Sequence, residues 1–334
     1  MTTNASESRT DLCRPVAAIA LALAAAAPAA ARDIPGPGVA VCDDPNAGAL
    51  TVKIAGRAAM GYQYGPAWDL THYWPLNSPS GKNMLVQKTK PYPHHRCFWF
   101  ADTIALGDSK PVSFYNGYYS GKKDANGGHG APFANRIRHV RFNEIKPGGR
   151  QAVIKETLVW QAGETRMLDE RRLVRIVDLG GGQYLMDVTF TVTAGYGDVT
   201  FRSDSVHYAW PYLRMNKTFN GDSGGVITTD TGKTGQKATS MTTPFVWVDY
   251  SKKFDAGAEG LAVFSHPDND HPHTWLTREY GTFGPRRPDD KSGKRFVLKK
   301  DEKMSQRIGV YVHRGDVKQA DVAGMYKKWA GGNL

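Results

Sequence analysis

The sequence lacks long hydrophobic runs beyond its first 31 residues, and it has only three cysteines among 334 residues. A transmembrane helix needs about 20 consecutive apolar residues, so we expect no membrane span after residue 31. Cys42 and Cys97 follow that segment. A disulfide between them and two separate thiols are equally open, because the sequence does not show how far apart their Cα atoms lie.

Several familiar functional signatures are also missing. There is no Gly-x-Ser-x-Gly elbow, the glycine run 180–182 is not followed by a helix pattern, and neither cysteine lies in a nucleophile motif. The formal net charge is +11, but the basic residues are scattered and form no basic helix or zinc finger. We therefore expect no nucleic-acid partner. A polyanionic glycan or simple solubility accounts for the charge.

The first 31 residues have the features of a cleaved signal peptide. Arg9 and Arg14 precede an apolar, alanine-rich run at 16–27, and three alanines at 29–31 offer a cleavage site. This predicts export to the periplasm or secretion. An uncleaved anchor is the alternative.

The rest of the chain reads as an extended leader at 32–49 and a single domain at 50–334. A strand pair is expected within 50–64, and strands rich in Val, Ile, Thr, Tyr and Phe at 136–145, 151–161, 165–177 and 183–194. Short glycine-rich turns between them predict an antiparallel meander. Strands so long and numerous favour an all-β fold, a large antiparallel β-sandwich.

One helix is expected, at the C-terminus. Asp316 is a suitable N-cap, and Val322, Met325 and Trp329 repeat at helical spacing. Met325 and Trp329 are interpreted as packing residues. Residues 228–240 are expected to form a surface loop.

Histidines gather in two proline-flanked segments. His94, His95 and Arg96 stand before an aromatic run, and His266 opens a second group that continues to His273. Proline disfavours regular sheet pairing, so both segments are expected in loops at the rim of the sandwich. A structural histidine bound to a backbone carbonyl is the alternative for each.

The proposed chemistry is proton transfer, because neutral imidazole is a base and imidazolium an acid near neutral pH. The candidate catalytic residues are His94, His95, His139 and His266. The candidate substrate-binding residues are Arg96, Trp99, Trp275, Arg278 and Tyr280. Tyr118 and Tyr119 lie between glycines and are expected to be exposed, where aromatic faces suit sugar rings.

A divalent metal is a further option. His271 and His273 would lie on one face of a strand, and two imidazoles in that position can start a ligand set. The third and fourth ligands are not identified, so a metal ranks below proton transfer by the histidines alone.

The motifs at 75–81 and 93–101 resemble those of the family labelled methane oxygenase PmoA. Further similarity occurs at 136–139, 170–172, 247–250, 266–281 and 313–315, and Cys97 stands where that family has glycine. The resemblance implies a secreted β-rich domain with His94, His95, Arg96, His139, His266 and Arg278 as its polar signature. Its architecture is expected to be similar to the supersandwich of galactose-mutarotase-like proteins.

These observations lead to three hypotheses. The first is a periplasmic or secreted enzyme that cleaves or isomerises a carbohydrate by histidine acid–base chemistry. The second is a metal-dependent oxygenase or hydrolase, and the third is a sugar-binding protein without catalysis. The hypotheses differ in whether a metal is bound and whether a product is released.

Overall fold

The computed structural model describes residues 32–34, 38–202, 209–239, 244–269, 274–287 and 295–334. The predicted signal peptide, residues 1–31, lies outside this part of the chain. Among the described residues, no helix is long and apolar enough to cross a membrane.

Two large antiparallel sheets make up most of the structure. The first has nine strands, in the order β1 (Arg32–Ile34), β2 (Val39–Asp44), β3 (Ala49–Ile54), β4 (Arg57–Gln63), β5 (His72–Leu76), β6 (Phe98–Trp99), β16 (Tyr212–Arg214), β21 (Thr282–Pro285) and β20 (Trp275–Thr277). The second has eight strands, in the order β11 (Asn135–Gly148), β12 (Gln151–Ala162), β13 (Thr165–Gly180), β14 (Gln183–Thr193), β23 (Lys303–Arg314), β19 (Gly257–Ser265), β18 (Trp247–Phe254) and β17 (Val226–Thr229).

Two small sheets and four short helices complete the fold of the described residues. The four-stranded sheet has the order β22 (Phe296–Leu298), β15 (Val199–Arg202), β7 (Thr103–Leu106) and β8 (Val112–Ser113), and β9 (Gly121–Lys123) pairs with β10 (His129–Phe133). The helices are two 3₁₀ turns, η1 (Gly117–Ser120) and η2 (Gly221–Ser223), and two α-helices, α1 (Gly235–Thr239) and α2 (Val322–Ala330). The predicted all-β sandwich with a C-terminal helix is confirmed.

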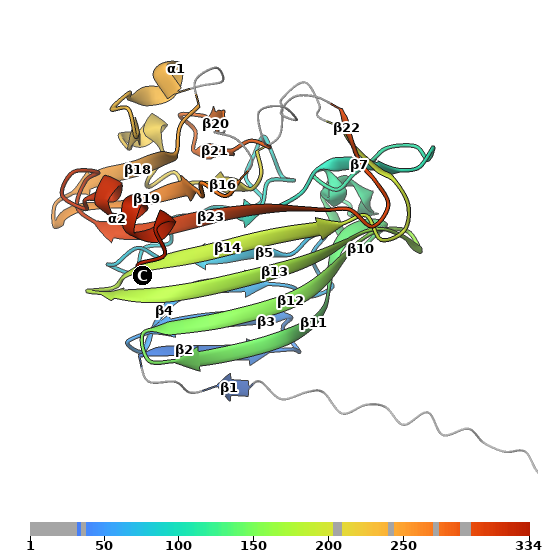
Figure 1. The fold of residues 1–334 in the computed structure, drawn as a ribbon, viewed down its shortest axis with the longest axis horizontal. Coiled ribbons are helices and arrows are strands. Elements are labelled where there is room, and N and C mark those ends of the chain that lie inside the picture. The colour runs from blue at the N-terminus through green and yellow to red at the C-terminus, as the bar shows by residue number, and fades with distance from the viewer. Residues whose placement is uncertain (1–31, 35–37, 203–208, 240–243, 270–273, 288–294) are drawn as a thin grey trace, which may run out of the picture.

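The predicted meander is the long-stranded half of the second sheet, drawn in green in Figure 1. Strands β11–β14 pair in sequence order, and each begins and ends within a few residues of its prediction. Buried and less buried residues alternate along β12 and β13. One face of these strands therefore points into the core, which is why period-2 hydrophobic patterning located them.

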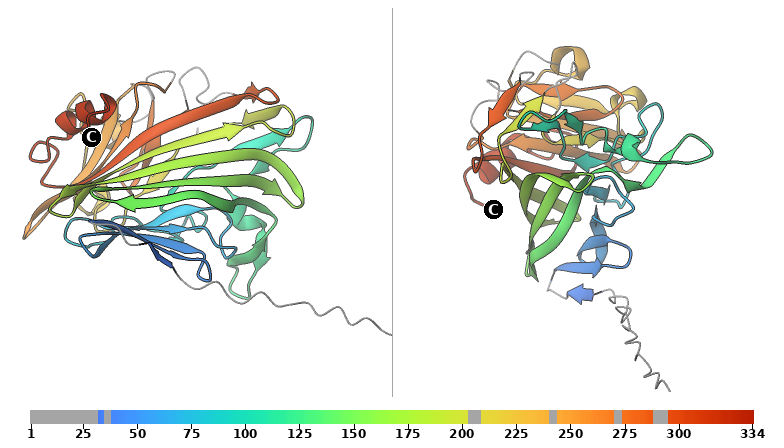
Figure 2. Two further views of the ribbon diagram at one scale, coloured as in Figure 1. Left: turned by 60° about the horizontal axis from the view of Figure 1, so that its bottom comes forward. Right: turned by 90° about the vertical axis from the view of Figure 1, so that its right-hand side faces the viewer.

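The two large sheets form layers around one hydrophobic core. Both panels of Figure 2 show the blue strands of the first sheet facing the green strands of the second. Phe98 of β6 packs edge-on against Phe190 of β14, with ring centroids 6.3 Å apart. Tyr184 of β14 donates a hydrogen bond to the Ala59 carbonyl of β4 at 3.0 Å. The layers are thus joined by both packing and hydrogen bonds.

A second, smaller core lies between α2 and the outer face of the eight-stranded sheet. Trp329 of α2 is buried against Phe264 of β19, as its spacing predicted, and Met325 packs at the edge of the same cluster. The predicted N-cap is wrong. Asp321 caps α2 by accepting a hydrogen bond from Gly324 N, while the carboxylate of Asp316 caps an earlier turn.

The structure also answers three further questions that the sequence raised, about the leader, the loop at 228–240 and the two cysteines. The predicted leader contains β1 and β2, and β2 is hydrogen-bonded to β3 within the sheet. The predicted loop 228–240 contains the end of β17 and helix α1. Cys42 and Cys97 do not form a disulfide; Cys97 is buried in the core, and burial raises the pKa of its thiol.

Candidate functional site

A cluster of imidazole, phenol and guanidinium groups lies where β6, β16 and β21 meet. β16 pairs with the other two strands, and the backbone N–H of Arg214, its last residue, donates to the Cys97 carbonyl at 2.7 Å. A hydrogen bond from His95 N to Tyr92 O closes the turn before β6. The members of this His94–Arg214 cluster are Tyr92, His94, His95, Tyr115, Tyr119, Arg214 and Tyr280.

His95 is the buried centre of the cluster, with 3% of its surface exposed. Arg214 Nη1 donates to its Nδ1 at 3.2 Å, so the ring proton must be on Nε2, which donates to Tyr115 Oη at 2.9 Å. Burial, followed by the charges of His94 and Arg214, lowers the pKa of His95 to about 2. With both nitrogens occupied, this neutral imidazole is better suited to positioning Arg214 than to transferring a proton.

His94 has a different environment. Its Nδ1 lies 3.2 Å from the Oη of Tyr119, which is 47% exposed, as its glycine-flanked position predicted. The same prediction is wrong for Tyr118, which is buried with 7% of its surface exposed. Its Nε2 has no hydrogen-bond partner in the described part of the chain. Burial, followed by the charges of Arg96 and Arg214, lowers the pKa of His94 to about 4. The ring is therefore neutral near pH 7, with one nitrogen held and the other available.

Arg214 is a buried cation without a carboxylate. Its side chain is 6% exposed, and its Nη1 also donates to Thr282 Oγ1 at 3.0 Å. The guanidinium carbon lies 4.3 Å from the ring centre of Tyr280 and 5.7 Å from that of Tyr92. No acidic side chain among the described residues forms an ion pair with it, and its buried Nε has no hydrogen-bond partner. Burial lowers the pKa of Arg214.

A cavity of about 460 Å³ adjoins Arg214. Its wall contains two aromatic rings, three cationic side chains and one carboxylate. The lining residues are Val86, Thr89, Lys90, Pro91, Tyr92, Arg214, Met215, Asn216, Lys217, Asn220, Asp222, Ser223 and Tyr280. A volume of this size accommodates a small polar ligand.

Three of the predicted substrate-binding residues are buried in structural roles. Arg96 forms a fully buried ion pair with Asp69. Trp99 stacks on the neighbouring strand at Tyr212, and Trp275 Nε1 donates to a backbone carbonyl at 2.8 Å. Each of the three has no more than 1% of its surface exposed. The protein therefore encloses all three side chains and leaves almost no surface for a ligand to contact.

Two predicted catalytic histidines lie outside the cluster. His139 on β11 pairs with Glu156 at 3.0 Å, within a buried network that includes Tyr62. His266 contacts Arg307 Nη1 at 3.0 Å and the ring of Trp329 near α2. Neither contacts His94 or His95 in the described structure. The structure therefore does not bring the four predicted histidines together.

The remaining predictions have mixed outcomes. Tyr280 lies in the cluster, whereas Arg278 Nη1 donates to the carbonyl of its own neighbour, Thr277. His271 and His273 fall outside the described residues. Within the described ranges, no group of three or more His, Cys, Asp or Glu residues could hold a metal ion.

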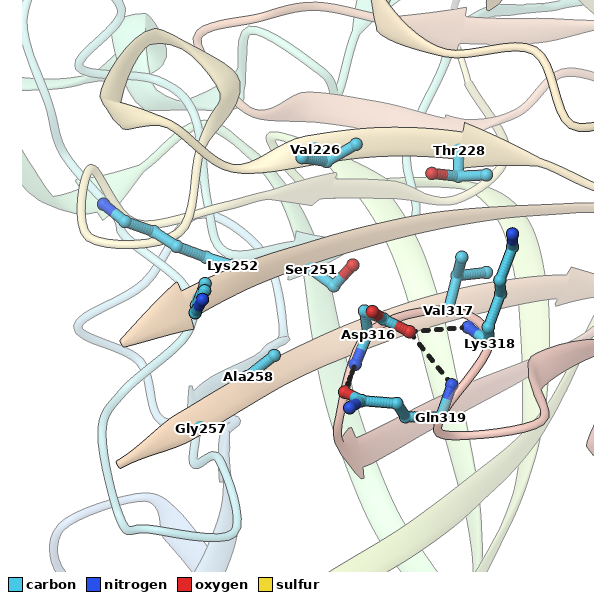
Figure 3. Close-up of a pocket in the computed structure, with 11 residues that line it drawn as sticks. Val226, Thr228, Ser251, Lys252, Gly257, Ala258, Asp316, Val317, Lys318 and Gln319 are labelled. Atoms are coloured by element: carbon cyan, nitrogen blue, oxygen red, sulfur yellow. Dashed lines mark hydrogen bonds between the residues drawn. The ribbon is translucent and has the colours of Figure 1, made fainter. Parts of the chain in front are cut away.

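A second hollow, of about 550 Å³, lies on the eight-stranded sheet beside the turn that follows β23. Figure 3 shows the Asp316 carboxylate in this turn hydrogen-bonded to the backbone of Lys318 and Gln319, so it is already occupied within the protein. Nearby, His313 and Asp249 form a pair at 2.8 Å, and both are fully buried. The residues that line this hollow include no histidine, and the His313–Asp249 pair is closed to solvent.

The sequence did not identify Arg214 or Tyr92 as site residues. Tyr92 lies between the two prolines that marked the His94 segment, so its position was a usable signal. Arg214 carried no such signal, because it ends an ordinary strand of buried residues. Its significance depends on which groups surround it in space.

Comparison with known families corrects the predicted resemblance. A model described as "Family of unknown function (DUF6807)" matches residues 49–327. The motifs from 75 to 315 that resembled methane oxygenase PmoA all lie inside this match, and nothing indicates that family, so the predicted membership is wrong. No curated protein matches the sequence.

Solved structures with a similar arrangement are distant in sequence. A galactose 1-epimerase from Lactobacillus acidophilus NCFM is 9% identical with a TM-score of 0.35, over 83% of this chain and 95% of that one. An α-galactosidase from Lactobacillus brevis is 6% identical with a TM-score of 0.39, over 86% of this chain and 40% of that one. A polysaccharide lyase is 14% identical with a TM-score of 0.31, over 76% of this chain and 32% of that one.

Proposed function

Because this chain belongs to the DUF6807 family of unknown function, its own residues have to indicate its chemistry, and we propose that it is an exported carbohydrate-active enzyme whose His94 transfers a proton during sugar cleavage or isomerisation. The observation that carries this proposal is the state of His94. It is a neutral imidazole with Nδ1 held by Tyr119 and Nε2 without a partner in the described structure. A positioned imidazole of this kind can act as a general base.

Tyr119 sets the direction of proton transfer. When His94 Nδ1–H donates to Tyr119 Oη, the lone pair of Nε2 is free to accept a proton from the substrate. The lowered pKa of His94, about 4, keeps the ring deprotonated over the neutral range. We assign His94 the role of base, with Tyr119 as the residue that orients it.

The aromatic rings around His94 suit a sugar. Tyr92 and Tyr119 are 36% and 47% exposed, and Tyr280 borders the adjoining cavity. The apolar face of a pyranose packs on such rings while its hydroxyls meet polar groups at the rim. A polar surface with two exposed tyrosines is therefore a better match for a carbohydrate than for a purely apolar ligand.

The test is a comparison of His94→Gln with the wild-type protein on a panel of polysaccharides, followed by mass spectrometry of released products. We expect kcat/KM on any responsive glycan to fall by about 10²- to 10⁴-fold, the usual contribution of a general base. Binding should change much less, because glutamine keeps a polar side chain there. Unchanged turnover in His94→Gln would contradict the assignment.

His266→Gln is the matched imidazole control, because His266 contacts Arg307 and Trp329 near α2 and lies outside the cluster. It should keep wild-type turnover once thermal unfolding confirms that it is folded. Sugar binding without any product from the wild-type protein would instead identify a sugar-binding protein.

Export is tested separately by fractionating cells that express the full chain. We expect the protein in the periplasm or medium with Arg32 as its first residue, since cleavage is proposed after the alanines at 29–31. An intact N-terminus on protein from the cytoplasm would contradict export without affecting the site.

A further inference from the structure

Arg214 differs from three other buried arginines of the described structure, Arg96, Arg172 and Arg287. Arg96 pairs with Asp69, Arg172 with Glu170 at 2.7 Å, and Arg287 with Asp102 at 3.6 Å. A buried cation is costly unless it is paired, and these three follow that rule. Arg214 is also buried, with 6% of its surface exposed, yet no carboxylate among the described residues pairs with it. Its missing counter-charge has to come from elsewhere.

The hydrogen-bonding geometry of Arg214 leaves part of the guanidinium unused. Only Nη1 has protein acceptors, the Nδ1 of His95 and the Oγ1 of Thr282. The Nε and Nη2 groups have none within the described ranges. A guanidinium presents its donors in a fixed planar fork that matches the oxygens of an anion.

The cavity beside Arg214 has an excess of positive charge. Lys90 and Lys217 line it together with Arg214, and Asp222 is the one acidic residue in its lining. Asp222 does not form an ion pair with Arg214 in the described structure, although its charge acts on Arg214 through space. Three cations against one carboxylate favour an anion in this space.

Resting on the carbohydrate function proposed above, we propose that the sugar is acidic, and that its carboxylate or sulfate group binds Arg214 in the cavity beside Tyr92 and Tyr280. The two rings that contact the guanidinium would pack against the sugar ring next to the anionic group. The formal charge of +11 on the whole chain would also attract an anionic glycan over a longer range.

The first experiment uses the wild-type protein and needs no variant. Binding of D-glucuronate, its methyl ester, D-glucose and glucose 6-sulfate is measured by titration calorimetry and saturation-transfer NMR. A charge-assisted hydrogen bond predicts that glucuronate or the sulfate binds about 10- to 100-fold more tightly than glucose. The methyl ester should bind like glucose, because it has lost the charge. The ratio of glucuronate to glucose 6-sulfate then identifies the anion.

The second experiment tests whether Arg214 causes that preference. Arg214→Met should bring the affinity for the acidic sugar to within about twofold of that for glucose, and Arg214→Lys should retain part of the preference. Lys300→Met is the control for net charge, because it removes one exposed positive charge elsewhere and should leave the preference intact. Retained glucose binding shows that a variant is folded.

The outcomes separate the two proposals. Equal binding of glucuronate and glucose by the wild-type protein overturns the acidic-sugar inference and leaves the carbohydrate function standing. A preference that survives Arg214→Met also overturns it. Absence of binding or turnover for every sugar, neutral and acidic, overturns the carbohydrate function on which the inference rests.

Discussion

Arg96 follows His95 in the sequence and Arg214 donates a hydrogen bond to the His95 ring, and the difference between these two arginines separates scaffold from site. Arg96 is fully buried and its charge is neutralised by Asp69. Arg214 is also buried, but its guanidinium meets only neutral acceptors and aromatic rings in the described structure. We assign the paired arginine to the scaffold and propose the unpaired one as the contact for an anionic ligand.

The largest expected effect is a loss of stability when Arg96, the paired arginine, is substituted. Arg96→Met leaves the Asp69 carboxylate buried without its cation, and breaking such a pair typically costs about 3–5 kcal/mol of the free energy of unfolding. Urea denaturation of the purified variant measures the loss. A variant as stable as the wild-type protein would show that Arg96 is not the structural arginine.

Arg214→Met should cost less stability, although it abolishes the proposed anion preference. It removes hydrogen bonds to His95 and Thr282 and leaves those acceptors unsatisfied, a loss of about 1–3 kcal/mol. The same urea experiment measures it. Equal losses for the Arg96 and Arg214 variants would remove the distinction between the two arginines.

His95, which accepts a hydrogen bond from Arg214, adds a pH dependence to the stability of the cluster. Its folded pKa of about 2 lies below the unfolded value of about 6.5, so the unfolded chain binds one more proton between these limits. The stability that His95 contributes is complete above about pH 6.5 and falls as the pH drops, by about 1.4 kcal/mol per pH unit. His95→Gln should flatten the stability profile between about pH 4.5 and 5.5 by that slope. Identical profiles for variant and wild type would contradict a neutral, buried His95.

The smallest effect is expected at Arg278, which the sequence had suggested as a substrate contact. Its guanidinium donates to the adjacent Thr277 carbonyl and has no other partner among the described residues. Arg278→Gln should change the free energy of unfolding by less than about 0.5 kcal/mol and leave the preference for acidic sugars unchanged in the same titrations. If Arg278→Gln lost the preference for acidic sugars, the anion contact would have to be assigned to Arg278 and not to Arg214.

The fold was more accessible from the sequence than the site was. Strands β11–β14 followed from alternating hydrophobic residues and glycine-rich turns, both of which act over a few residues. The start of α2 was misplaced because Asp316 does cap a turn, and its local pattern is the same as that of a helix cap. Short sequence patterns predict short-range structure well. They fail when the same pattern, such as a capping aspartate, occurs in both a turn and a helix start.

The site depended on contacts between distant segments. His139 and His266 were grouped with His94 by residue type, but their partners Glu156 and Arg307 keep them elsewhere. Arg214 was missed because the property that distinguishes it is the absence of a nearby carboxylate in space. A sequence shows which charges a chain has, whereas only the fold shows which of them are neutralised.

The nine-stranded sheet narrows at the cluster, where β6 has two residues and β16 has three, while β11–β14 of the facing sheet have 11 to 16. Few ladder hydrogen bonds therefore constrain the segments that carry Tyr92, His94 and Tyr280, and the broad hydrophobic interior does not depend on their side chains. Substitution of Tyr92, His94 or Tyr280 should alter ligand choice at little cost to folding, whereas Arg96 in the same segment has to be kept for its ion pair with Asp69. Libraries confined to these three positions offer a practical route to new specificities on an unchanged framework.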